Sequence, residues 1–264
     1  MAAHKVVVTA VGTGGYMGKS LKLKMVNLTC DPITVTVDPA LIFKPIDTNY
    51  QNLVVVGDEN IDLQPDKETN VVVQTFCGKN AARIPRANLR FNFWKQGDSI
   101  LIKTVRYIKQ NNFYNHLGQS AVWTVINGTC ISTIYDPEYP ENSKEFIAFE
   151  ADMRKLPVPS YYSYYQLDTT GYGASCVAAK GKQFVDLEYK EGIARHVYVI
   201  VLDDKGRLYN KGNIAEHIKD GNHTITLQFD DTKDREGLYS VFLRNDNNDI
   251  LSNKTVRVGM DWCY

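Results

Sequence analysis

Three side chains have types and spacing that could do chemistry together: Cys77, Gln119 and Trp123. Cys77 follows residues 70–76, whose alternating apolar pattern predicts a strand and places Cys77 in its inward-facing row. Gln119 and Trp123 lie four residues apart in GQSAVWTVIN, which predicts a short helix, so they share one helix face. If this helix packs across the end of that strand, a thiol and a carboxamide meet beside an indole.

Such a meeting has a chemical consequence. A cysteine thiolate can attack the carbonyl carbon of a glutamine side chain, expel ammonia and leave an internal thioester. Water would hydrolyse this acyl store, so the site needs an apolar cover, for which Trp123 is suited. A lysine amine or a hydroxyl of a partner could then take the acyl group and become covalently attached.

The same segments carry a resemblance to a known family. FCG at residues 76–78 and GQSAVW at residues 118–123 resemble the two signature segments of bacterial thioester domains, in which an aromatic-Cys element precedes Gln-x-Ala-apolar-Trp. The resemblance implies a β-sandwich with an inserted helical part, secreted or cell-surface and adhesive rather than enzymatic. It implies Cys77 as the nucleophile and Gln119 as the acyl donor, with Phe76, Ala121 and Trp123 packed around the bond.

Two alternatives stand beside this reading. Buried cysteines are common, and a glutamine near a helix N-terminus is often a cap, so the fold could exist without the bond. Cys77 could also pair with His116 as a hydrolase dyad, but no orienting acid stands at a telling position. His116 lies one turn ahead of Gln119, where it could instead polarise the carboxamide. We therefore expect a protein that is not an enzyme.

The elements around these residues predict an α+β module over residues 1–156. Up to residue 76 the chain reads as short strands, with Leu21, Leu23 and Met25 on one face, and this spacing suggests a β-sandwich. Three helices follow: one capped by Asp98 or Ser99, one containing GQSAVWTVIN and stopped by Gly128, and one capped by Ser143 and closed before Pro157.

The rest of the chain predicts a linker and a second domain. Residues 157–176 are rich in Pro, Tyr, Ser and Gly, and read as a linker packed between domains. Residues 177–264 read as strands only, and VLDDKGRLY, DGNHTITLQF and GLYSVFLRN resemble immunoglobulin-like β-sandwich modules at the ends of bacterial secreted and filament proteins. A platform for sugar or peptide stacking is the alternative for the linker tyrosines, Tyr161, Tyr162, Tyr164 and Tyr165.

Composition narrows the partners. The 30 basic and 30 acidic side chains cancel, which argues against nucleic acid, and no apolar run reaches the roughly 18 residues of a membrane span. GTGGYMGKS lacks the glycine spacing of a phosphate loop, so we expect no cofactor. Five cysteines without a CxxC pair argue against a metal site. We expect a protein amine or a surface glycan as partner, and an extracellular or cell-surface location although no leader is visible.

Overall fold

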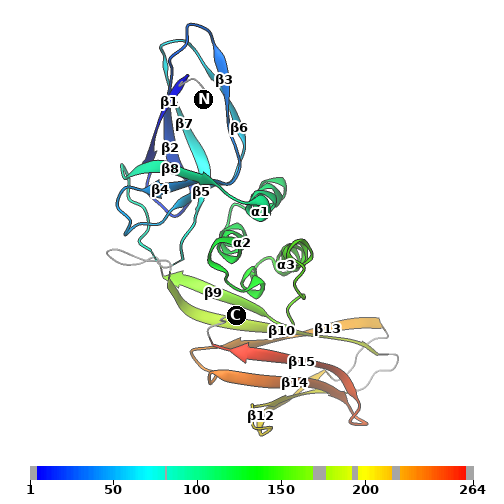
Figure 1. The fold of residues 1–264 in the computed structure, drawn as a ribbon. Coiled ribbons are helices and arrows are strands. Elements are labelled where there is room, and N and C mark those ends of the chain that lie inside the picture. The colour runs from blue at the N-terminus through cyan, green and yellow to red at the C-terminus, as the bar shows by residue number, and fades with distance from the viewer. Residues whose placement is uncertain (1–4, 81, 169–176, 192–195, 216–220, 260–264) are drawn as a thin grey trace. The chain divides into compact units, whose positions relative to one another are not determined.

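The computed structural model describes residues 5–80, 82–168, 177–191, 196–215 and 221–259 (Figure 1). The chain forms two compact units: Met1–Thr129, Asp152–Lys155 and Leu167–Val177 in the first, and Cys130–Ala151, Leu156–Gln166 and Ala178–Tyr264 in the second. The described part is mostly β with three α-helices, as the expected α+β class requires. The division falls earlier than the predicted boundary at residue 156, and the chain crosses between the units more than once.

Six strands of the first unit close into a barrel, where the sequence predicted a sandwich. The sixth strand, β8 (Arg90–Gln96), pairs with β4 (Leu41–Pro45) along its length and with β1 (Val6–Gly12) at two residues, and so joins the two edges of the sheet. The inward row of β2 follows the predicted alternation, since Leu21, Leu23 and Met25 are buried. In barrel order the strands are β1 (Val6–Gly12), β2 (Met17–Asn27), β7 (Glu68–Cys77), β5 (Leu53–Val55), β4 (Leu41–Pro45) and β8 (Arg90–Gln96).

A separate two-stranded sheet extends the core of this unit. β3 (Ile33–Val37) pairs with β6 (Glu59–Leu63) in antiparallel register. Ile61 and Leu63 of β6 join the same hydrophobic cluster as the inward residues of β2. The barrel and the two-stranded sheet therefore share one core.

The helices begin and end where local capping dictates. The Asp98 side chain accepts a hydrogen bond from Leu101 N at 2.9 Å and caps α1 (Ser99–Gln110), as predicted. Asn115 caps α2 (His116–Asn127), and Gly128 ends it in the left-handed conformation at φ 68°.

The predicted Ser143 cap of the third helix is wrong. Helix α3 (Pro140–Arg154) begins three residues earlier at a proline, whose fixed φ and missing N–H suit a first helical position. Ser143 is buried inside the helix, where its hydroxyl donates to Tyr139 O at 2.7 Å and accepts from Asp136 N at 2.9 Å.

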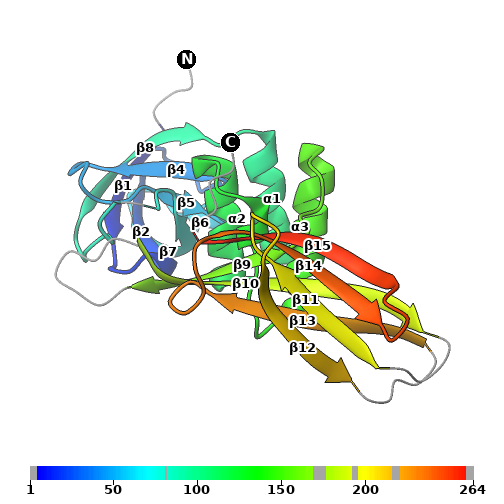
Figure 2. The ribbon, with the colours of Figure 1, turned by 90° about the horizontal axis from the view of Figure 1, so that it is seen from below.

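The second unit contains two β-sheets that contribute to one core, and Figure 2 shows its strands side by side. Val185 and Leu187 of one sheet join the same cluster as Val199 and Val241 of the other. Part of the predicted linker forms strand β9 (Tyr162–Asp168), and linker residues 169–176 lie outside the described residues. The sheets are β13 (Gly221–Asp230), β10 (Val177–Glu191) and β9 (Tyr162–Asp168), and β12 (Leu208–Ala215), β11 (Val197–Leu202), β14 (Gly237–Asn245) and β15 (Ile250–Val258). A short 3-10 helix, η1 (Ile131–Thr133), precedes α3.

An ion pair and stacked aromatic rings attach residues 130–151 to the three-stranded sheet of this unit. Lys144 Nζ lies 2.7 Å from Oδ2 of the buried Asp186, whose Oδ1 accepts from Thr226 Oγ1 at 2.6 Å. The Tyr135 and Tyr162 rings stack with centroids 5.0 Å apart. Burial, and secondarily the Asp186 charge, raises the pKa of Tyr135 to about 12.

We predict that the free energy of unfolding falls less steeply at alkaline pH in Tyr135→Phe than in the wild type. Unfolded tyrosine ionises near about pH 10, whereas folded Tyr135 keeps its proton to about 12, so its contribution is complete below pH 10 and lost between these values. The wild-type free energy of unfolding should fall by up to about 2 kcal/mol more than that of the variant over this range. Urea unfolding from pH 9 to 12 measures it. Equal slopes for wild type, Tyr135→Phe and the exposed control Tyr139→Phe would contradict the assignment.

Candidate functional site

The side chain of Gln119 lies against the backbone of Cys77. Gln119 Oε1 accepts a hydrogen bond from Cys77 N at 3.0 Å, and Gln119 Nε2 donates to Cys77 O at 2.9 Å. Both residues are fully buried, and Cys77 is not part of a disulfide. The predicted meeting of strand end and helix is therefore present, with the carboxamide bound by the main chain of the cysteine.

The hydrogen-bond pattern of β7 explains why the N–H and C=O of Cys77 are available to a side chain. Gly78 N donates to Asn52 O at 2.9 Å on the β5 side, and successive residues of a strand point their peptide groups to opposite sides. The peptide groups of Cys77 therefore face the β2 side. There β2 begins at Met17, which lies opposite Phe76. The Gln119 carboxamide takes the ladder position beyond that pair, because it presents an N–H donor and a C=O acceptor side by side, as a strand edge does.

A glycine lets α2 approach the strand closely enough for these bonds. A methyl group on Gly118 would lie 2.1 Å from Phe113 O and 2.8 Å from Cζ of the buried Phe76 ring. No side chain fits there, so Gly118 brings the helix directly onto Phe76. The G of GQSAVW thus has a steric role.

Two apolar residues of α2 are buried in the same unit as the pair. Ala121 is fully buried, and Trp123 belongs to the same core cluster as Cys77. Within the described part of the chain, Trp123 Nε1 has no hydrogen-bond partner, so the indole acts here as an apolar group. The side chain of Gln119 is 0% exposed, so its carboxamide does not contact solvent.

His116 lies on the first turn of α2. Its Nε2 is 3.3 Å from Oγ of the buried Ser120, the neighbour of Gln119. The predicted residues Phe76, Cys77, Gln119, Ala121 and Trp123 are thus all buried in the first unit, and His116 lies one turn from the pair.

The four linker tyrosines do not form an exposed row. Tyr162 stacks on Tyr135, and Tyr165 donates from its hydroxyl to Gly259 O at 3.1 Å. Burial raises the pKa of Tyr164, and all four tyrosines, including Tyr161, are only partly exposed. Tyr161, Tyr162 and Tyr165 therefore contribute to the packing of the second unit.

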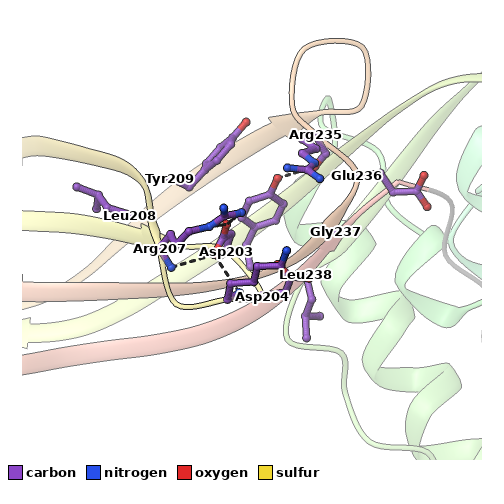
Figure 3. Close-up of a pocket in the computed structure, with 11 residues that line it drawn as sticks. Asp203, Asp204, Arg207, Leu208, Tyr209, Arg235, Glu236, Gly237 and Leu238 are labelled. Carbon is purple, nitrogen blue, oxygen red and sulfur yellow. Dashed lines mark hydrogen bonds and ion pairs between the residues drawn. The ribbon is translucent and has the colours of Figure 1, made fainter.

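The second unit has an open pocket that the sequence analysis did not predict. It has a volume of about 410 Å³, and Figure 3 shows Leu208 and Tyr209 on one side of it with Arg235 and Glu236 on the other. Arg207 pairs with Asp203 at 2.7 Å, and Tyr209 donates to Asp234 at 2.8 Å. These polar side chains of the pocket therefore already bind other side chains of the same unit. The full lining is Asp203, Asp204, Lys205, Arg207, Leu208, Tyr209, Arg235, Glu236, Gly237, Leu238 and Tyr239.

The cysteines divide into different states. Cys30 is an exposed thiol and Cys130 is part of a disulfide, while Cys176 and Cys263 lie outside the described residues. Within the described ranges, no group of three or more His, Cys, Asp or Glu could hold a metal ion. None of the described helices has the length and apolarity needed to cross a membrane.

Comparison of the chain with protein-family models gives no match, and neither does comparison with curated proteins. The site therefore has to be interpreted from its own geometry.

We predict that Gly118→Ala destabilises the first unit by about 2–4 kcal/mol, because the added methyl group must push α2 away from Phe76 and strain both bonds to Cys77. Gly57→Ala is the matched control, since nothing lies within 4 Å of its added methyl group. Urea unfolding of the two variants measures the difference. Equal stability would show that the close approach is not required.

Proposed function

We propose that the first unit forms an internal thioester between Cys77 Sγ and Gln119 Cδ and uses it for covalent attachment to an amine of a partner protein. The observation that carries the proposal is the buried contact of the Gln119 carboxamide with Cys77, residues 42 apart in sequence. The resemblance to thioester domains supports the same pair independently of the contact.

The bond-forming step balances without a cofactor. The Cys77 thiol loses its proton, its sulfur attacks Gln119 Cδ, and negative charge develops on Oε1. The Cys77 N–H, 3.0 Å from Oε1, is placed to stabilise that charge. The bond from Cδ to Nε2 then breaks, and the nitrogen leaves as ammonia carrying the thiol proton.

The second step attaches the partner. Its neutral amine attacks Cδ of the thioester, the bond from Cδ to sulfur breaks, and the amine proton returns to the Cys77 thiolate. An amide links the partner to Gln119. Because the pair is fully buried, the partner must first open the cover that Trp123 and its neighbours provide. The same cover slows hydrolysis, so the acyl group can wait for a partner.

The proposal implies a non-enzymatic adhesion protein on a bacterial surface, in which the second unit acts as an immunoglobulin-like support. Each chain reacts once, since attachment consumes the acyl store. This setting follows from the resemblance and from the chemistry of an attachment that does not turn over.

A structural module without a thioester is the second candidate. It is favoured by the two hydrogen bonds that hold the Gln119 carboxamide on the Cys77 backbone, since a strand-end cap needs no more than these. A surface glycan as partner has less support, because the linker tyrosines are packed within their own unit.

We predict that methylamine labels the folded protein at Gln119. A small amine should reach Cδ during local opening and convert the thioester into N-methylglutamine with release of the Cys77 thiol. Peptide mass spectrometry after digestion locates the label, and a thiol reagent applied after denaturation detects the released sulfur.

Three variants make the labelling test selective. Cys77→Ala and Gln119→Ala should both abolish labelling, whereas Cys30→Ala should leave it unchanged, because Cys30 is the exposed thiol. Absence of label in folded wild-type protein would favour the structural candidate. Label that persists in Cys77→Ala would show chemistry that does not pass through the cysteine.

A further inference from the structure

The barrel is closed between β1 and β8 by a very short ladder. β1 pairs with β2 along all of its residues, but with β8 only at Ala10 opposite Phe91 and Val11 opposite Arg90. Figure 1 shows the two strands diverging beyond this point. Among the described residues, the first half of β1 therefore has no strand on its β8 side.

The backbone directions show what this opening presents. Lys5 O accepts from Leu28 N on the β2 side, whereas Gly12 N donates to Leu89 O on the β8 side. Since peptide groups alternate along a strand, those of Val6 and Val8 point away from β2 and towards the opening. On β8, Arg90 O accepts from Ile46 N, so the peptide groups of Arg90 point to the β4 side. By the same alternation, the peptide groups of Phe93, three residues later, point to the β1 side.

Side chains on the inward face are exposed at this place. Val8 shares a face with Ala10, yet it is 47% exposed against 6% for Ala10. Phe93 shares a face with Phe91, yet it is 59% exposed against 3%. Trp94 beside it is also exposed. We call Val6, Val8, Phe93 and Trp94, with the open edges that carry them, the β1–β8 seam.

The β1 edge of the seam lacks the usual protection of a sheet edge. Natural edge strands carry charges, prolines or bulges that discourage pairing, but β1 reads VVVTAVG. A valine-rich edge with outward-pointing peptide groups suits the addition of another strand. Such an added strand would also cover the exposed apolar side chains of the seam.

The basic residues around the seam favour an added strand with acidic side chains. β1, β4 and β8 together carry Lys44, Arg90 and Lys95 and no acidic residue. Lys44 Nζ lies 3.6 Å and Lys95 Nζ 4.6 Å from the centroid of the Trp94 ring, so two ammonium groups gather at the seam. A second copy of this chain would bring the same cations, whereas an acidic strand complements them.

We propose that the β1–β8 seam binds an extended segment of a partner protein by strand addition, with apolar side chains of the segment towards Phe93 and acidic side chains towards Lys44, Arg90 and Lys95. This inference does not depend on the bond between Cys77 and Gln119, because the seam lies on other elements of the unit.

Fluorescence anisotropy with a labelled peptide of alternating valine and glutamate tests the proposal on the full chain. We expect saturable binding, weakened about tenfold when lysine replaces each glutamate in the peptide. Equal binding of both peptides, or no saturable binding of the acidic one, would overturn it. The Cys77→Ala variant should bind the peptide as the wild type does, which separates this result from that of the thioester test.

Two protein variants examine the backbone and the charge separately. Val8→Pro removes an N–H that faces the opening and leaves the β2 ladder intact, so we expect about a tenfold loss of binding. Lys95→Glu should weaken binding about as much, and the exposed control Lys67→Glu should not. If Val8→Pro does not fold, the comparison of Lys95→Glu with Lys67→Glu still tests the proposal. Unchanged binding in Lys95→Glu, or self-association through the seam in sedimentation, would contradict an acidic partner strand.

Discussion

The two hydrogen bonds between the Gln119 carboxamide and the Cys77 backbone are the constraint on which the first unit depends. A fully buried amide must have partners for its donor and its acceptor, and here one residue supplies both. This requirement fixes where α2 crosses the end of β7. It also explains Gly118, because any side chain there would hold the helix away from Phe76.

Structure and proposed chemistry use the same contact. The Cys77 N–H that satisfies Oε1 in the amide is also the donor that the developing oxyanion needs, so reaction requires little rearrangement of the main chain. The opening at the β1–β8 seam lies on other strands of the barrel. In the proposed function, the first unit would combine a buried reactive pair with an open strand edge that binds a partner segment.

Local rules predicted part of this arrangement. Asp98 caps the start of α1 and Gly128 ends α2, as expected. Periodicity placed Cys77 in the inward row of its strand and Gln119 on one helix face with Trp123, but it did not show that the helix packs across the end of that strand. The barrel could not be predicted, because β8 lacks alternation: its Phe91 is buried while Phe93 and Trp94 are exposed. The carboxamide contact with the cysteine backbone was also beyond reach, since it depends on where β2 begins, and that is set by tertiary pairing rather than by local sequence.

The intact mass of freshly purified, denatured protein tests the central claim most directly. A thioester between Cys77 and Gln119 lowers the mass by one ammonia molecule relative to the encoded sequence with the Cys130 disulfide formed, and Cys77→Ala or Gln119→Ala should each remove this deficit. A wild-type mass without the ammonia deficit, in protein that has never been exposed to amines, would contradict the account and leave the buried carboxamide as a structural cap.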